Sequence, residues 1–235
     1  MGSSWAESAL SWWEEAGVHT IVGEEPRDWL NPKAAPAKYA AAPAPAMPAE
    51  AMPGSLDAFL PWLAATQSLP LAATGASRIA PAGDPAAGLM MLADMPSAED
   101  AAAGFLFSGE TGQLFERMLG AIGRSRETIY LAPFSPIRPA AGRIDPEGVG
   151  TLADIARHHI GLAAPRALLL FGDSCARALL GQPMAAARGR WHDLETPAGP
   201  VRTLVTLRPQ ELLSQPKLKA HAWADLQLLM EGLKP

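Results

Sequence analysis

Apolar positions beyond residue 54 follow two patterns, one typical of buried strands and one typical of amphipathic helices. Four short apolar runs predict strands buried on both faces; they span residues 88–93, 128–132, 166–171 and 201–206. Around them, apolar residues recur every three or four positions, which predicts helices over residues 55–66, 112–122, 146–162, about 173–181 and 216–233. Because strands and helices alternate, we predict an α/β fold with three layers, α/β/α, around a central four-stranded parallel sheet.

The first 54 residues have a different pattern. Ser4 and Glu7 have capping-box spacing, and three tryptophans among residues 5–13 favour a helix that ends at Gly17. Residues 33–53 contain five prolines and ten alanines, which is typical of a semi-extended linker. We therefore divide the chain into a Trp-rich helical arm (1–32), a Pro/Ala-rich linker (33–54) and an α/β domain (55–235). The tryptophans of the arm either dock on the protein's own core or bind a partner.

Charge is unevenly spread along the 235 residues. The whole chain has 19 basic and 24 acidic side chains, a net charge of −5, which argues weakly against a nucleic-acid partner. Residues 1–100 carry 4 basic and 12 acidic side chains (net −8), whereas residues 157–235 carry 10 and 6 (net +4). Such asymmetry indicates either an interaction surface or an ordinary solvated surface that is basic.

Cysteine content and hydropathy limit the class of protein. Cys175 is the single cysteine, which excludes an internal disulfide framework and a multi-cysteine metal or iron–sulfur site. No apolar run approaches the ~20 residues that span a bilayer, and the start of the chain lacks a signal-peptide pattern. We therefore expect a cytoplasmic protein with no membrane association.

Ligands of parallel α/β sheets bind beyond the carboxyl ends of the strands. The segments that follow the predicted strands begin at Asp94, Pro133, Gly172 and Leu207. These segments are where we expect the functional residues.

The same segments resemble the motifs of uracil-DNA glycosylases of the bacterial iron–sulfur type (family 4/5-like), in order and spacing, over about residues 55–233. The first motif is similar to residues 94–97 (DMPS) and 104–109 (GFLFSG), and the Tyr-Ile-Thr-Asn segment to residues 130–133 (YLAP). The Arg-Gly-x-Trp segment is similar to residues 188–191 (RGRW). The motif Thr-x-His-Pro-Ser-Tyr-Leu-Leu is similar to residues 206–213 (TLRPQELL). The resemblance implies a fold that agrees with the strand–helix pattern.

The chain departs from this family at the cluster. The resemblance places the four cluster cysteines approximately at Leu69, Ala72, Ile137 and Leu152, which are all apolar. Without thiolates no iron–sulfur cluster can form, so we expect no cofactor and no metal, and we expect packing to fill the space. Cys175 lies elsewhere and is expected to pack as a small hydrophobic residue.

The chemical positions change as well. The resemblance implies catalytic roles for Asp94, at the position of the family's acid, and for Arg208, at the position of its histidine. It implies a base-binding set at Met95, Pro96, Phe107 (the family's stacking Phe) and Pro133 (its uracil-reading Asn). DNA-binding candidates are Arg188, Arg190, Gln210 and Lys219.

Each chemical position also has a structural interpretation. Asp94 either orients water or caps backbone groups, and Phe107 either stacks on a base or belongs to the core. Arg208 either stabilises the departing base, contacts a phosphate or fills surface. Pro133 has no side-chain amide with which to read a base edge.

These departures favour a degenerate homologue with weak or no uracil excision that retains a DNA-facing groove, so the expected partner is DNA. One alternative is an active DNA glycosylase of altered specificity that hydrolyses the N-glycosidic bond of a flipped base. A second alternative is a protein-interaction module that binds a protein partner through the Trp-rich arm.

Overall fold

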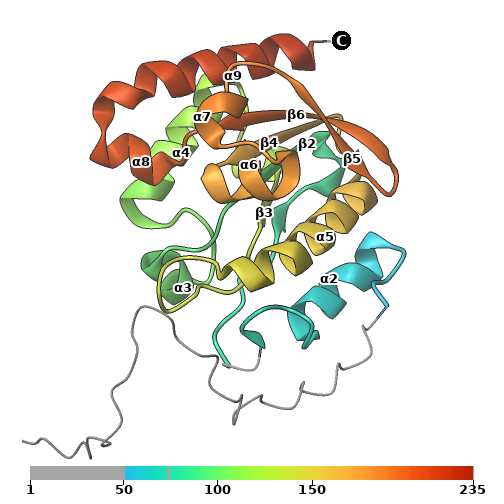
Figure 1. The fold of residues 1–235 in the computed structure, drawn as a ribbon. Coiled ribbons are helices and arrows are strands. Elements are labelled where there is room, and N and C mark those ends of the chain that lie inside the picture. Colours follow the sequence, from blue (N-terminus) through green and yellow to red (C-terminus); the bar gives the residue numbers. More distant parts are fainter. Residues whose placement is uncertain (1–50, 73–74, 235) are drawn as a thin grey trace, which may run out of the picture. The chain divides into compact units, whose positions relative to one another are not determined.

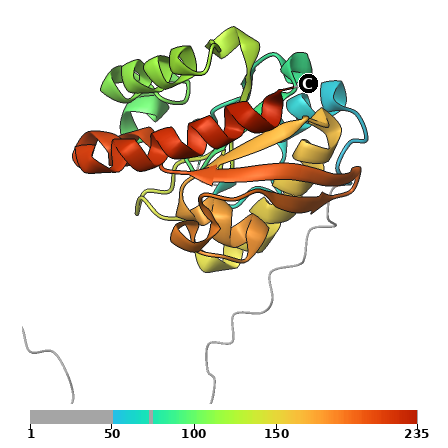
Figure 2. The same cartoon turned by 90° about the horizontal axis from the view of Figure 1, so that it is seen from above.

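The computed structural model describes residues 51–72 and 75–234. The predicted Trp-rich arm and all but the last residues of the predicted linker lie outside the described residues, so the division of the chain at residues 32 and 54 stays a prediction. Within the described part, a three-layer α/β/α arrangement is confirmed (Figures 1 and 2).

The centre of the sheet is parallel, as predicted. Its strands are β2 (Leu89–Ala93), β3 (Tyr130–Pro133), β4 (Ala167–Phe171) and β6 (Gly199–Thr206). The register pairs Ala93 with both Pro133 and Phe171, and Phe171 with Thr206. The four parallel strands therefore end side by side, which brings the segments that follow them to one edge of the sheet.

The prediction of a four-stranded sheet is incomplete, because the sheet in the described residues has six strands in the order β1-β3-β2-β4-β6-β5. The antiparallel edge strands are β1 (Ala82–Gly83), paired with β3, and β5 (His192–Thr196), paired with β6. Both residues of β1 are exposed, and β5 has a single buried side chain, Leu194. Neither edge strand has the apolar run by which the inner strands were found.

Alternate residues of the inner strands face two apolar layers. Met90 and Leu92 of β2 join one cluster, whereas Leu89, Met91 and Ala93 join the other. The first face is covered by α2 (Leu56–Ala65), α5 (Pro146–Ala163), α6 (Asp173–Leu180) and α7 (Met184–Ala187). The second face is covered by α4 (Gly109–Ala121) and α9 (Lys219–Leu233), which lie on the opposite side of the sheet in Figure 2.

The remaining short elements were not predicted as separate. They are α3 (Ala98–Ala103), α8 (Pro209–Ser214) and the 3₁₀ turns η2 (Pro85–Ala87), η3 (Arg126–Thr128) and η4 (Pro216–Leu218). The predicted helix over residues 216–233 is therefore a 3₁₀ turn followed by α9. The described helices include none with the length and hydropathy needed to span a bilayer.

Candidate functional site

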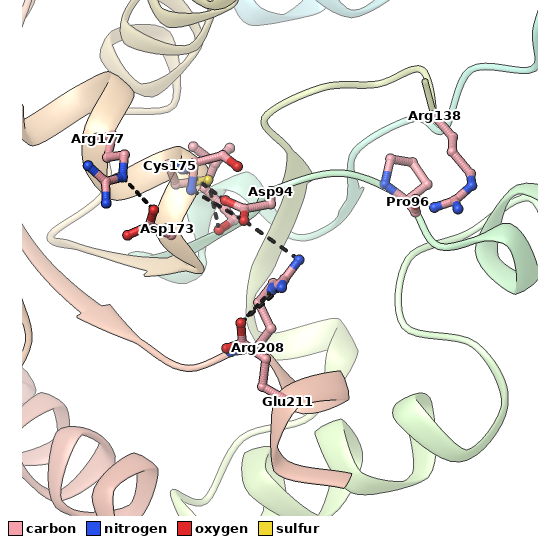
Figure 3. Close-up of polar contacts among 10 residues, drawn as sticks. Asp94, Pro96, Arg138, Asp173, Cys175, Arg177, Arg208 and Glu211 are labelled. Carbon is pink, nitrogen blue, oxygen red and sulfur yellow. Dashed lines mark hydrogen bonds and ion pairs between the residues drawn. The ribbon is translucent and has the colours of Figure 1, made fainter. Parts of the chain in front are cut away.

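Asp94 is the first residue after β2 and lies at the centre of the aligned strand ends (Figure 3). Its side chain is 3% exposed. Oδ1 accepts a hydrogen bond from the backbone N–H of Cys175 at 2.8 Å, and Oδ2 accepts a longer one from that of Ser174 at 3.4 Å. Since these N–H groups belong to the first turn of α6, the Asp94 carboxylate caps that helix from a neighbouring strand.

Gly172 makes this cap sterically possible. It is the N-cap residue of α6 and has no side chain to cap the helix itself. Its φ angle is +96°, and a Cβ atom here would lie 2.2 Å from Oδ2 of Asp94. Any other residue would therefore be strained and would displace the carboxylate. Of the two interpretations of Asp94, capping is the one that the hydrogen bonds show.

Arg208 is the N-cap residue of α8, and its guanidinium lies between two carboxylates (Figure 3). Its Nε and Nη2 donate to Oε1 of Glu211 at 3.2 and 2.9 Å. Its Nη1 lies 3.9 Å from Oδ2 of Asp94, and 36% of the side chain is exposed. Arg208 is thus held in place by Glu211, with its remaining nitrogen toward Asp94.

Burial and charge act in opposite directions on the carboxyl group of Asp94. Burial raises its pKa above the ordinary aspartate value, while the hydrogen bonds from Cys175 and the charge of Arg208 lower it. Burial and the nearby Asp94 charge also raise the pKa of the Cys175 thiol well above its ordinary value. Cys175 is fully buried in the apolar cluster under α6, in agreement with its expected role as a small hydrophobic residue.

Phe107 lies in the core in this structure. Its side chain is 2% exposed, and its ring packs against Phe115 and Phe171 with centroids 4.6 and 5.5 Å apart. Its φ angle of +54° is unusual for a bulky residue. Arg126 holds this backbone by donating to the carbonyl oxygens of Leu106 and Phe107 at 3.0 and 2.6 Å.

Of the other base-binding candidates, Met95 and Pro96 belong to the loop after β2, and Pro133 ends the neighbouring strand β3. Met95 is half-buried and Pro96 is buried. The carbonyl oxygen of Pro96 accepts a hydrogen bond from Arg138 at 3.0 Å. Pro133 is the buried last residue of β3 and, as the sequence implied, brings no polar side-chain atom to the strand ends.

One of the DNA-binding candidates, Arg188, forms an ion pair within the protein. Arg188 donates to Oδ2 of Asp225 through Nε and Nη2, at 2.8 and 2.7 Å, and Asp225 also accepts from Thr206 at 2.8 Å. Asp225 is 2% exposed, so this ion pair ties the segment after α7 to β6 and α9. DNA contact by Arg188 therefore stays a prediction, and in this structure its Nε and Nη2 are paired with Asp225.

None of the other three candidates forms a hydrogen bond or ion pair with Asp94 in the described residues. Arg190 is exposed and donates to Gln182, and Lys219 is exposed at the start of α9. Gln210 has a buried Oε1 with no hydrogen-bond partner among the described residues. Within the described part of the chain, the hydrogen bonds and ion pairs connect Arg208 to Asp94 but none of the other candidates.

The sequence interpretation missed Glu211 and Gly172. Glu211 is three residues after Arg208, which is capping-box spacing, and its carboxylate accepts from the Arg208 backbone N–H at 3.1 Å. That spacing, with Pro209 at the first helical position, could have predicted α8 and its contact with Arg208. The closeness of Gly172 to Asp94 depends on β2 and β4 being neighbours, which no local signal reports.

A family model described as the uracil DNA glycosylase superfamily matches residues 80–227, which include all the site residues discussed so far. The chain belongs to the uracil-DNA glycosylase superfamily.

Two curated relatives are type-4 uracil-DNA glycosylases of archaea. The protein of Pyrobaculum aerophilum is 24% identical over 157 residues, which cover 64% of this chain and 80% of the relative. The protein of Archaeoglobus fulgidus is 21% identical over 184 residues, which cover 75% of this chain and 92% of the relative. Both are distant, but each alignment extends over most of the relative.

Within this superfamily fold, the positions at which the resemblance places cluster cysteines all belong to, or pack against, one apolar cluster of the core. Leu69, Ile137 and Leu152 are 3%, 1% and 1% exposed and belong to a single buried cluster, and Ala72 packs against it. We call these four residues the apolar corner. Their side chains offer no atom that can ligate iron, so they do not fit a cluster. The described residues contain no group of three or more His, Cys, Asp or Glu side chains placed to hold a metal ion.

Proposed function

We propose that this chain is a divergent uracil-DNA glycosylase-like protein that excises uracil weakly or not at all and keeps a DNA-facing surface. Superfamily membership supports DNA as the partner, since both relatives are named for action on uracil in DNA. The main support for weak or absent excision comes from the contacts of Asp94.

A glycosylase must stabilise charge on the departing base and position water at the sugar. The carboxylate of Asp94 is instead directed at two backbone N–H groups of α6, and the nearest cation, Arg208, is bound to Glu211. Redirecting Asp94 toward water would leave the buried N–H of Cys175 unpaired, which costs about 1–3 kcal/mol. This arrangement supports a structural role for the carboxylate and a loss of its catalytic role.

The residues at the base-binding positions also support weak or absent excision. A site that hydrogen-bonds a base edge can discriminate by orders of magnitude, and Pro133 contributes no side-chain donor or acceptor. Phe107 packs against Phe115 and Phe171, so stacking on a base would require its ring to leave the core. Phe105, two residues earlier, is 48% exposed, and the Arg126 guanidinium lies 5.8 Å from its ring centroid.

An excision assay tests this proposal. Wild-type protein is incubated with uracil-containing single- and double-stranded DNA beside a type-4 uracil-DNA glycosylase, and abasic sites are cleaved and counted. We expect little or no product, and no further loss in Asp94→Asn. Robust excision that Asp94→Ala abolishes would overturn the proposal and favour the active enzyme of altered specificity.

DNA binding is tested separately by titration at several salt concentrations. We expect affinity to fall steeply with salt, since counterions are released when phosphates are neutralised. Arg190→Ala removes an exposed cation next to the motif at residues 188–191 and is expected to weaken binding. Arg166→Ala, an exposed arginine directly before β4 and therefore at the opposite edge of the sheet, is the matched control. Binding that is independent of salt would contradict a phosphate-led mode.

The proposal that the Trp-rich arm binds a protein partner rests on sequence alone, because the arm lies outside the described residues. Full-length protein with Trp12 and Trp13 changed to alanine is compared with wild type in a partner pull-down. Equal recovery of partners would eliminate the arm as the binding element.

A further inference from the structure

A groove of about 460 Å³ lies between α4, α8 and α9. Figure 2 shows α4 and α9 side by side on the same face of the sheet. The lining is mostly apolar and includes Leu114 and Met118 of α4, Leu212 of α8, and Ala222, Trp223 and Leu226 of α9. The groove floor contains a small buried cluster that includes Leu114, Leu212 and Ala222. The groove is therefore a preformed apolar cleft outside the strand-end site.

Trp223 makes this surface unusual. Its side chain is 41% exposed, which places it with Leu71 and Phe105 among the exposed large hydrophobic residues of the described part. An indole at the rim of an apolar cleft is a typical anchor of a protein interface, because it buries a large area with little loss of conformational entropy. The surface at α9 therefore has the composition of a binding site.

Two cations flank the apolar lining, Arg117 on α4 and Lys219 on α9. Neither forms an ion pair among the described residues, whereas Arg126, Arg157, Arg177, Arg188 and Arg208 all do. No carboxylate is among the residues that line the groove. The unpaired charge on both walls is complementary to a ligand that carries acidic groups on either side of an apolar face.

We propose that the α4–α8–α9 groove docks an acidic amphipathic helix of a partner protein. A helix presents apolar side chains at i, i+3, i+4 and i+7, which suits a cleft between two helices, and acidic residues beside this stripe meet Arg117 and Lys219. Aliphatic walls favour apolar side chains over nucleotide bases, which need hydrogen-bonding groups or several aromatic platforms.

The groove also adjoins the strand-end site through α8. Leu212 lines the groove, and its neighbour Glu211 holds Arg208 near Asp94. The docking proposal does not depend on excision or on DNA binding, so its test is independent of the proposed function.

The probe is a synthetic fluorescein-labelled helical peptide of about 18 residues with Leu and Trp along one stripe and Glu on both flanks. Its affinity for the full-length protein is measured by fluorescence anisotropy. The matched probe has Lys in place of every Glu. We expect the Glu peptide to bind at least tenfold more tightly than the Lys peptide, with an affinity that falls as salt rises.

Two variants locate the binding site. Trp223→Ala removes the exposed indole and is expected to weaken binding of the Glu peptide at least tenfold. Arg117→Glu combined with Lys219→Glu is expected to reverse the preference, so that the Lys peptide binds more tightly than the Glu peptide. The controls are Phe105→Ala, an exposed aromatic outside the groove, and Arg143→Glu, an exposed cation outside it; both should leave the affinities unchanged. Circular dichroism confirms that each variant is folded.

Several results would overturn the proposal. Equal binding of the two peptides, no binding of either, or insensitivity to both groove variants would exclude an acidic helical ligand here. An oligothymidylate that binds more tightly than the Glu peptide and loses affinity in Trp223→Ala would assign the groove to single-stranded nucleic acid. Self-association of the full chain that Trp223→Ala abolishes would assign it to a second copy.

Discussion

The apolar corner and the strand-end site both lie where the superfamily resemblance places functional residues, yet they are built in opposite ways. In the corner, Leu69, Ile137 and Leu152 are almost completely buried and have no polar atom in their side chains. At the strand ends, Asp94 is equally buried but remains ionisable, and Arg208 is partly exposed.

A buried apolar position and a buried carboxylate have different structural requirements. An apolar corner is satisfied by packing alone, because dispersion contacts and burial need no specific partner. A buried carboxylate must be hydrogen-bonded or paired. The Asp94 carboxylate obtains its partners from Ser174, Cys175 and Arg208, and through the first two it supports the first turn of α6.

The largest expected effect comes from the apolar corner. Leu152→Ala should destabilise the protein by about 2–5 kcal/mol, because it removes buried methyl groups and leaves a cavity. The measurement is urea-induced unfolding. Leu71→Ala is the matched control, since that side chain is 38% exposed, and it should cost less than about 1 kcal/mol. Similar values for the two variants would mean that the corner is not tightly packed.

The next largest effect is a pH dependence of stability that comes from His159, which packs against Phe59 of the same apolar cluster. His159 is 3% exposed, its ring lies 4.9 Å from that of Phe59, and its Nε2 is 2.8 Å from the Tyr130 hydroxyl oxygen. Burial, and secondarily the charge of His158, lowers the pKa of His159 from 6.5 to about 4. The unfolded chain therefore takes up this proton first, so stability is lost as the pH falls from 6.5 to 4, by about 3 kcal/mol.

Unfolding free energies of wild type and His159→Gln, measured across this pH range, check the prediction. The variant should lose most of the pH dependence, whereas His192→Gln, on the edge strand β5, should keep it. An unchanged slope in His159→Gln would show that the loss at acid pH has another origin and that the cluster tolerates a charge.

A smaller effect is expected at the strand ends. Asp94→Ala should cost about 1–3 kcal/mol, because the buried N–H of Cys175 loses its acceptor. Asp94→Asn keeps an oxygen for that bond and should cost less. Because burial raises the pKa of Asp94, its contribution to stability is full at acid pH and decreases as the pH rises through that pKa. Asp94→Asn should therefore gain stability relative to wild type as the pH rises above about 4, which urea unfolding at several pH values measures.

The smallest effect is expected for the partly exposed ion pair between Arg208 and Glu211. Glu211→Gln weakens the ion pair with Arg208, which is partly exposed and screened by solvent, so the cost should stay below about 1 kcal/mol. Thermal unfolding at low and high salt measures it. A loss as large as that of Asp94→Ala would mean that Glu211 and Arg208, and not the backbone of α6, provide the main support for Asp94.

Hydrophobic periodicity predicted the four inner strands and the long helices, because each of these elements has its signal within its own residues. It missed β1 and β5, whose residues are mostly exposed, and the short helices α3, α7 and α8, which span too few residues for a helical repeat. At the site, the resemblance implied catalytic roles for both Asp94 and Arg208, and the structure places Nη1 of Arg208 3.9 Å from Oδ2 of Asp94. The partners of the site residues could not be predicted in this way. The ion pair of Arg188 with Asp225 and the hydrogen bonds of Asp94 with α6 join segments that are distant in the sequence.

The sequence by itself determined the α/β class, the superfamily resemblance and the replacement of the cluster cysteines, because these depend on residue types and their spacing. Only the tertiary structure decided that the four replaced positions join one apolar cluster and that Asp94 caps α6. It also decided that Arg117 and Lys219 face an open apolar groove. The physical reason is that burial, capping and pairing are properties of which segments become neighbours, and strand order and helix packing set those neighbours across more than a hundred residues of chain.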